Sequence, residues 1–382
     1  MAPFERTRTS EQKTIGSRLG IAEAIMNGTT TIGDDGMDME GAIAFIDEVG
    51  ARANVSVRIR EAAYKLYKPG QIYDFDPAMG ERTLNDALAM FNKYDGKDNG
   101  RMRIRFSPQG CDFLSQELML KVRDIAKERH SKIHMHLQQS DRETDQMMRR
   151  YGMRAIPWLD KVGYIDKDFI GIHLSTAEPE EVKTVVARGA NMVFCPTSIM
   201  ITNGVIPPGK AFKDAGGKVG LGSDQAAGNN AHNIIREMNM TCLAVKSQYR
   251  NAVIMPCWEA LRMATIEGAQ ALGIDNVTGS LEVGKDADII LVDTRYPNLT
   301  PVMTVPMRTF IPNFVYAGQG REVDTVMVQG KFLVKDKKPV TFDVGKLIDD
   351  AQREAEKLGV AAEKEFLEVN GPNARYMREG KL

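Results

Sequence analysis

The chain has 382 residues, of which 43% are hydrophobic and 26% are charged, and its 50 basic and 51 acidic side chains leave a formal net charge of −1. This composition excludes a disordered chain, and the charge balance excludes attraction of the whole chain to nucleic acid or anionic lipid. No apolar run approaches the roughly 20 residues of a membrane span, the polar start MAPFERTRTSEQK lacks the apolar core of a signal peptide, and the four cysteines have no regular spacing. We therefore expect a reduced, cytoplasmic, globular protein.

β-rich runs alternate with helical patterns as far as Asp224, and this alternation predicts a parallel sheet. Each run is followed by a helical segment, which is the order expected of parallel βαβ units. The predicted strands cover residues 28–34, 53–59, 101–108, 132–139, 169–174, 191–197 and 218–224. The helical patterns include residues 39–49, 114–129, 178–188 and 231–246.

The pattern changes after Asp224. Residues 258–273 predict a helix, and the short strands 287–293 and 325–334 predict a small β-rich region. Residues 343–368 predict a charged helix near the C-terminus that is exposed to solvent.

All five histidines lie at or after His130, and two of them share one predicted strand. Residues two apart in a strand face the same side, so His134 and His136 point together. Because barrel active sites are built from the carboxyl ends of parallel strands, this pair indicates a metal or catalytic site. Taken alone, the pair also fits a buried hydrogen-bonded pair or a pair on an edge strand.

Two further residues of the same kind end other predicted strands. His173 lies near the end of strand 169–174, and Asp224 ends strand 218–224. An aspartate after a glycine is usually a turn residue or a helix cap, but three such residues at strand ends favour a site. Two histidines and an aspartate are ligands that Zn²⁺ and Fe²⁺ accept.

These motifs resemble the amidohydrolase superfamily, in the branch of metal-dependent deaminases and dechlorinases that act on nucleobase-like heterocycles. The resemblance extends from about Gly20 to Lys331. The motifs that carry it are GTTTIGD at 28–34 for the second strand, IHMHLQQ at 133–139 for the fifth, GIH at 171–173 for the sixth, CPTS at 195–198 for the turn after the seventh, GLGSDQAAGNN at 220–230 with Glu237 and Met238 for the eighth, and GSLEVGKDADIILVD at 279–293 for the return to a small β-sandwich.

The resemblance implies a fold, a cofactor and roles for three residues. His136 would bind the metal, Asp224 would bind it and take a proton from the attacking water, and His173 would polarise the substrate or position the attacking hydroxide. The cofactor would be one divalent transition metal, with zinc first and iron or manganese as alternatives, and the substrate a small molecule. The expected parts are a TIM-type (β/α) barrel over residues 1–275, a partial β-sandwich over 276–340 and a helical tail over 341–382.

The chain departs from the family at its start. The family's first barrel strand carries a metal-binding HxH pair, whereas this chain begins after that strand and has no histidine before His130. We therefore expect a barrel that lacks its first strand, with open edges that favour a homo-oligomer or a small partner chain supplying the strand and its HxH. Truncation, a split enzyme and a complete protein with an incomplete barrel stay open. The third metal ligand would be His173 or His134, or would come from another chain.

Three further departures concern the chemistry. The family's general acid–base glutamate corresponds to Gln139, and an amide cannot shuttle a proton near neutral pH. Gln109 follows Pro108 where the family often has a substrate-binding histidine, and Ile199 replaces an asparagine. We expect Asp224, His173 and Gln139 to be the catalytic residues, with protons supplied by Asp224, His173 or water. Gln109, His134 and Gln139 are expected to contact the substrate.

These observations favour a metal-dependent hydrolase of a C–N, C–Cl or C–S bond in a nucleobase-like heterocycle or an amide-like small molecule. The main alternative is a noncatalytic or partner-dependent subunit of a split amidohydrolase, and a weaker one is a metal-free lyase or isomerase. We rank the hydrolase first because His136, His173 and Asp224 are all present.

Overall fold

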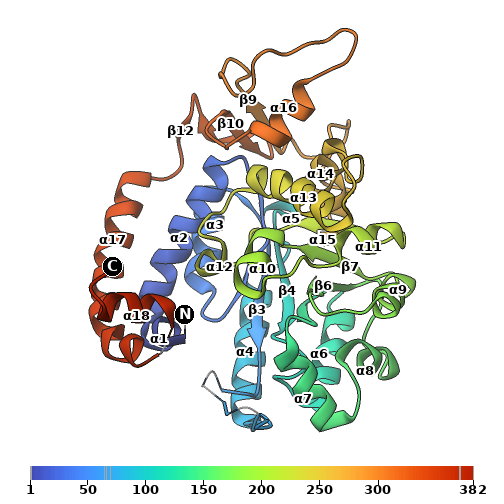
Figure 1. Ribbon diagram of the computed structural model, residues 1–382, viewed down its shortest axis with the longest axis vertical. Helices are drawn as coiled ribbons and strands as arrows, with labels where there is room; N and C mark the ends of the chain where they lie inside the picture. The colour runs from blue at the N-terminus through green and yellow to red at the C-terminus, as the bar shows by residue number, and fades with distance from the viewer. Residues whose placement is uncertain (1, 64, 66, 69, 370, 382) are drawn as a thin grey trace.

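The computed structural model describes residues 2–63, 65, 67–68, 70–369 and 371–381, and its main element is a curled sheet (Figure 1). The sheet has eight parallel strands, of which seven follow the order β1-β3-β4-β5-β6-β7-β8, and the eighth, β2, pairs with β3. The strands are β1 (Thr31–Ile32), β2 (Asp35–Gly36), β3 (Arg52–Ile59), β4 (Met102–Pro108), β5 (Ile133–Leu137), β6 (Phe169–His173), β7 (Asn191–Phe194) and β8 (Val219–Leu221). The predicted parallel sheet is confirmed, although most strands are shorter than predicted.

The two ends of this sheet are β1 and β8. Among the described strands, β1 pairs only with β3 and β8 pairs only with β7. The described part of the chain therefore forms a curled half-barrel. That the protein lacks a preceding barrel strand stays a prediction.

The sequence of β3 shows how the two faces of the sheet differ. Val55 and Val57 are buried and alternate with Ser56 and Arg58, which is the period-two pattern of a strand. The apolar face packs against helix α4 (Pro77–Tyr94), where Phe91 stacks on Phe106 of β4 with ring centroids 5.3 Å apart. Ser56 and Arg58 lie on the opposite, inner face. This face is therefore polar, and it carries the candidate site.

Helices cover the outer face of the sheet (Figure 1). Their bounds are α2 (Ser10–Met26), α3 (Glu40–Val49), α6 (Gln116–Glu128), α7 (Asp141–Tyr151), α8 (Ala155–Lys161), α9 (Pro179–Ala187), α11 (Gly209–Asp214) and α13 (Ile234–Tyr249). Two short helices, α10 (Pro196–Asn203) and α12 (Ala226–Asn229), follow β7 and β8 at the carboxyl ends of the strands. The helices predicted at 39–49, 114–129, 178–188 and 231–246 are confirmed within a few residues. In the described part of the chain, no helix combines the length and apolar character needed to cross a bilayer.

The prediction of one helix over 258–273 is wrong, because the structure has two. Helix α14 (Cys257–Met263) and helix α15 (Ile266–Leu272) are separated at Thr265, whose φ of −128° and ψ of −107° are not helical. The hydroxyl of Thr265 donates to the backbone oxygen of Leu261 at 2.7 Å, a local bond that favours bending of a helix.

A second sheet follows, with the antiparallel order β12-β11-β10-β9. Its strands are β9 (Ile289–Val292), β10 (Val323–Val328), β11 (Lys331–Lys335) and β12 (Lys338–Pro339). The single strand predicted at 325–334 is therefore wrong. Gln329 and Gly330 have φ angles of 50° and 75° and turn the chain into a hairpin, with apolar residues on both sides of the turn.

A buried guanidinium joins the two sheets. Arg52 begins β3, and its side chain is 2% exposed. Its Nε donates to Oδ2 of Asp288 at 2.6 Å, and its Nη2 donates to Oδ2 of Asp286 at 2.5 Å. The four-stranded sheet is thereby fixed at the amino end of the parallel strands.

The chain ends in helices α17 (Val344–Glu368) and α18 (Pro372–Arg378), so the predicted C-terminal helix is confirmed. It is not wholly surrounded by solvent, because α17 runs beside α2 and α1 (Ala2–Thr7) (Figure 1). The rings of Phe4 and Phe366 lie 5.5 Å apart in this contact.

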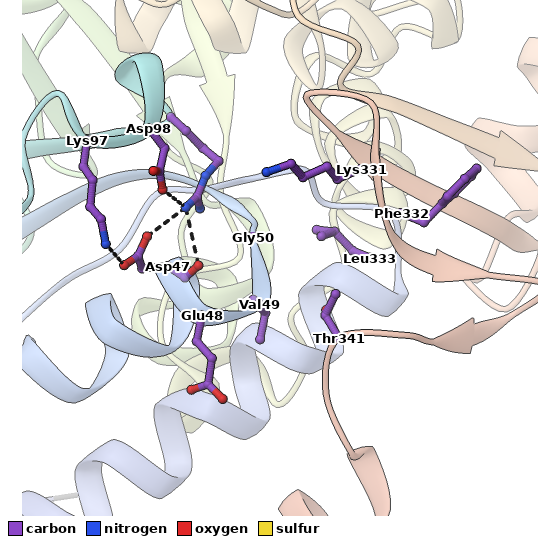
Figure 2. Close-up of a pocket in the computed structure, with 11 residues that line it drawn as sticks. Asp47, Glu48, Val49, Gly50, Lys97, Asp98, Lys331, Phe332, Leu333 and Thr341 are labelled. Carbon is purple, nitrogen blue, oxygen red and sulfur yellow. Dashed lines mark hydrogen bonds and ion pairs between the residues drawn. The ribbon is translucent and has the colours of Figure 1, made fainter.

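A cavity of about 400 Å³ opens where the second sheet meets the amino ends of β3 and β4 (Figure 2). Asp47 pairs there with Lys97 and with Arg101, whose Nη2 lies 2.8 Å from Oδ1 of Asp47. The other lining residues include Lys331 and Leu333 of β11. This cavity lies at the opposite end of the strands from the predicted site.

Candidate metal centre

Three of the predicted site residues converge at the carboxyl ends of the strands. His136 belongs to β5, His173 ends β6, and Asp224 follows β8. One ligand atom from each residue lies within 4.8 Å of the other two. The rings of the two histidines have centroids 5.3 Å apart, and Nε2 of His173 is 4.0 Å from Oδ2 of Asp224.

Strand alternation places the first histidine. Ile133, Met135 and Leu137 are buried on the outer face, whereas His134 and His136 are half-buried on the inner face. The burial pattern of β5 therefore agrees with the prediction that the imidazoles of His134 and His136 point to the same side of the sheet. His134 lies two residues before His136 and therefore further from the carboxyl end of β5. Of this pair, only His136 belongs to the cluster with His173 and Asp224.

His173 reaches the cluster through an unusual backbone. It pairs with Leu137 rather than with His136, so strict alternation would point its side chain away from His136. Its φ is +73°, in the left-handed region that non-glycine residues seldom adopt. This conformation turns the imidazole toward the cluster, where it is completely buried.

The aspartate is held by a hydroxyl. Asp224 also has a left-handed backbone, with a φ of +58°. Oγ of Ser198, in α10, donates to Oδ2 of Asp224 at 2.5 Å. Beside it, Oγ of Ser223 lies 3.0 Å from Nδ1 of His232, which fixes the chain next to the aspartate.

The donor set fits a divalent transition metal. Both ring nitrogens of His173 are buried and have no hydrogen-bond partner among the described residues. The distance of 4.0 Å between Nε2 of His173 and Oδ2 of Asp224 is too long for a hydrogen bond but is about twice a zinc–donor distance of roughly 2.0–2.2 Å.

Both histidines of the cluster favour the neutral form. Burial and then the Arg58 charge lower the pKa of His136 to about 3, and burial lowers the pKa of His173. Neutral imidazoles are the form that binds metals.

An ion pair that the sequence analysis missed lies beside His136. Nε of Arg58 donates to Oδ2 of Asp35 at 2.9 Å, and that oxygen is 3.5 Å from Nδ1 of His136. Burial is the largest influence on the pKa of Asp35 and would raise it, but the Arg58 charge, the two nearby histidines and the Ser107 side chain together outweigh burial and hold that pKa below its usual value. Their positions in the sequence could have indicated this pair, because Asp35 directly follows predicted strand 28–34 and Arg58 lies within predicted strand 53–59.

Gln139 lies in the turn after β5. Its backbone N–H donates to Oε2 of Glu143 at 2.9 Å, and the N–H of Gln138 donates to Oε1 at 3.0 Å. Nδ2 of Asn203 donates to the backbone oxygen of Gln139 at 3.0 Å. These contacts fix the backbone from which the Gln139 side chain extends.

The two remaining predicted residues lie outside the cluster. Gln109 follows β4 and is 6% exposed, and its Oε1 has no hydrogen-bond partner among the described residues. Nδ1 of His134 is also buried without such a partner. Burial lowers the pKa of His134. Both side chains therefore have polar atoms left over for other contacts.

A curled parallel sheet with histidine and aspartate side chains at the carboxyl ends of its strands is the arrangement of the α/β-barrel enzymes, whose active sites lie at that end of the strands. The chain belongs to the amidohydrolase family, because the sequence model of that family matches residues 4–333. The resemblance inferred from the sequence motifs is therefore confirmed, and the chain is an amidohydrolase-type enzyme.

Its relatives include deaminases. A 5'-deoxyadenosine deaminase of Methanobrevibacter smithii is 30% identical over 360 residues, which cover 94% of this chain and 79% of that protein. A 5-methylthioadenosine/S-adenosylhomocysteine deaminase of Pelotomaculum thermopropionicum is 31% identical over 359 residues, which cover 93% of this chain and 78% of the relative.

Two solved structures share the fold. An adenosine deaminase from Xanthomonas campestris with bound zinc superposes with a TM-score of 0.84 at 23% identity, covering 94% of this chain and 78% of that one. Atrazine chlorohydrolase from Arthrobacter aurescens TC1, complexed with zinc, gives a TM-score of 0.81 at 20% identity, covering 91% and 78%.

Proposed function

We propose that the protein is a metal-dependent hydrolase that cleaves a C–N bond in a nucleobase-like heterocycle. The observation that carries this proposal is the convergence of His136, His173 and Asp224 within 4.8 Å at the carboxyl ends of three strands. The deaminases among the relatives support an amino group on a purine-like ring as the first substrate class. The second candidate reaction is cleavage of a C–Cl or C–S bond, or of a C–N bond in an amide-like small molecule.

His136, His173 and Asp224 would hold one divalent metal, with zinc as the first candidate and iron and manganese as alternatives. When bound, such an ion activates water for attack near neutral pH. Asp224 would accept the proton of the attacking water, while the Ser198 hydroxyl keeps its carboxylate in place. His173, which is completely buried, would contact both the metal and the substrate.

The residues around the cluster would bind the substrate. Gln139 stands in the position of an acid–base glutamate, and its amide can donate to a ring nitrogen or accept from an amine but cannot carry the proton. Gln109 and His134 have buried polar atoms without partners among the described residues, which fits contact with a polar heterocycle. Protons for the leaving group would come from Asp224, His173 or water.

Turnover on a small panel tests the proposal. The zinc-loaded protein is incubated with 5'-deoxyadenosine, 5'-methylthioadenosine, S-adenosylhomocysteine and atrazine, and products are measured by chromatography. We expect release of ammonia from at least one adenosine derivative, and loss of that activity in Asp224→Asn. Zinc-loaded protein that turns over none of the four compounds would contradict the proposal.

Association with another chain belongs to the same proposal. Among the described strands, β1 and β8 each pair on one side only, and an edge strand of this kind can pair with a second chain. We expect a homo-oligomer or a complex with a small chain that carries an HxH pair, and the mass of the purified protein in solution checks this. A cytoplasmic location stays a prediction.

A further inference from the structure

A buried carboxylate beside the ligand cluster is held by a guanidinium. Asp35 begins β2, and its side chain is only 5% exposed. Arg58 of β3 donates twice to Asp35, from Nε to Oδ2 at 2.9 Å and from Nη2 to the backbone oxygen at 3.2 Å. The first bond holds the carboxylate, and the second holds the guanidinium to the backbone of the same residue, so the carboxylate and Arg58 stay in register.

The same carboxylate oxygen faces His136. Oδ2 of Asp35 lies 3.5 Å from Nδ1 of His136, close enough for the carboxylate to interact electrostatically with a proton on that nitrogen. A neutral imidazole carries its proton on one nitrogen and offers the other as a ligand. With Nδ1 facing a carboxylate, the proton is favoured on Nδ1, and Nε2 is the nitrogen left to bind an ion.

Asp35 has acceptor capacity beyond its bond to Arg58. Its Oδ1 is buried and has no hydrogen-bond partner among the described residues. Buried carboxylate oxygens usually have partners, because water is lost on burial. The oxygen that faces His136 is Oδ2, which accepts one bond from Arg58, and a carboxylate oxygen has lone pairs for two, so Oδ2 can also accept from Nδ1–H of His136.

Starting from the metal centre in the proposed function, we propose that Asp35, fixed by Arg58, is a positioning residue that accepts the Nδ1–H of His136 and thereby presents Nε2 to the metal. Carboxylates that orient a metal-binding histidine fix its tautomer and its ring direction, and their loss typically weakens metal binding by about 10- to 100-fold. The pair comes from β2 and β3, which carry no ligand of the cluster.

Zinc affinity tests this inference without a substrate. Zinc-free wild type, Asp35→Asn and Asp38→Asn compete with a chromophoric chelator for zinc. Asp38 is the matched control, because it lies on the same segment and pairs with Lys13 at 2.6 Å, with its side chain 43% exposed. We expect Asp35→Asn to bind zinc about tenfold more weakly or worse, Asp38→Asn to match wild type, and Asp35→Glu to recover part of the loss.

The outcomes separate this inference from the proposed function. If wild type binds zinc and Asp35→Asn binds it equally well, the inference is wrong and the metal centre stands. If wild type itself binds no zinc, the proposed metal centre is wrong, and the inference with it.

A spectroscopic measurement distinguishes positioning from a structural role. Histidine ¹H–¹⁵N spectra of the zinc-free protein should show His136 protonated at Nδ1 in wild type, with this preference weakened in Asp35→Asn. Should Asp35→Asn fail to fold, Arg58→Lys provides the second variant, because it keeps the charge and loses the two fixed bonds. A purely structural ion pair would lower the thermal midpoint in these variants and leave the tautomer and the zinc affinity unchanged, which would overturn the inference.

Discussion

Oε2 of Glu143 accepts the backbone N–H of Gln139 at 2.9 Å, so a buried carboxylate holds the turn that carries a predicted substrate contact. Burial, followed by the nearby charge of Asp112, raises the pKa of Glu143 to about 7 from an ordinary value of 4.5. This acid therefore titrates in the folded protein at a pH at which an unfolded chain has already lost the proton.

The first prediction concerns stability and pH. Because the folded state keeps this proton more tightly than the unfolded state, the free energy of unfolding falls as the pH rises from about 4.5 toward 7. The fall is roughly 3 kcal/mol for a shift of this size. We expect Glu143→Gln to flatten this decline, measured by urea unfolding at several pH values. Glu117→Gln, at an exposed acid of α6, should keep the wild-type slope, and an equal slope in Glu143→Gln would contradict the assignment.

The second prediction concerns the hydroxyl at Asp224. A hydrogen bond to a charged group contributes about 1.5–3 kcal/mol, so Ser198→Ala should lower kcat/KM roughly tenfold or more. Steady-state kinetics on the best substrate of the panel measure this. Thr202→Ala is the control, because Thr202 lies on the same helix and donates to the backbone oxygen of Ser198 rather than to the carboxylate. Equal losses in the two variants would mean that disturbance of α10, and not the bond to Asp224, causes the effect.

The third prediction concerns Gln139. Gln139→Glu introduces a carboxyl that can carry a proton, at a position next to the first turn of α7, where negative charge is favoured. We expect deamination of 5'-deoxyadenosine to rise at least tenfold while zinc content is unchanged. Gln248→Glu, on the exposed side of α13, adds the same charge away from the turn and should have no effect. Zinc-loaded Gln139→Glu with wild-type or lower turnover would show that proton delivery does not limit the reaction.

The fourth prediction concerns metal removal. A ligand that binds only the folded state raises the free energy of unfolding by about 2.7 kcal/mol at 100 times its Kd. Adding zinc to chelator-treated protein should therefore raise the thermal midpoint, and His136→Asn should abolish most of that increase. His130→Asn, at an exposed histidine, should keep it. A midpoint that zinc leaves unmoved in wild type would contradict a metal centre in this chain.

The parallel sheet could be predicted because each strand alternates or concentrates β-forming residues between helical segments. The β10–β11 hairpin could not, since apolar residues flank its turn on both sides and Gln329 is not a typical turn residue. The break in the helix predicted at 258–273 was missed for a similar reason, because Thr265 stands in an otherwise continuous helical pattern.

The cluster could be predicted in part. His136, His173 and Asp224 were named because each stands near a strand end. What alternation cannot predict is the left-handed backbone that turns His173 inward. Asp35 and Arg58 were missed because their partnership depends on how β2 and β3 pair, and a sequence alone does not state that register.

The left-handed backbones of His173 and Asp224 limit how this protein can be made more stable. Each such residue costs the folded state about 1–3 kcal/mol that a glycine at the same position would largely avoid. Substitutions selected only for heat resistance should therefore favour glycine at these two positions and remove the ligands with it. Thermal robustness and ligand geometry thus oppose each other at two positions in the same cluster, and a stabilised version of this protein has to gain its stability elsewhere.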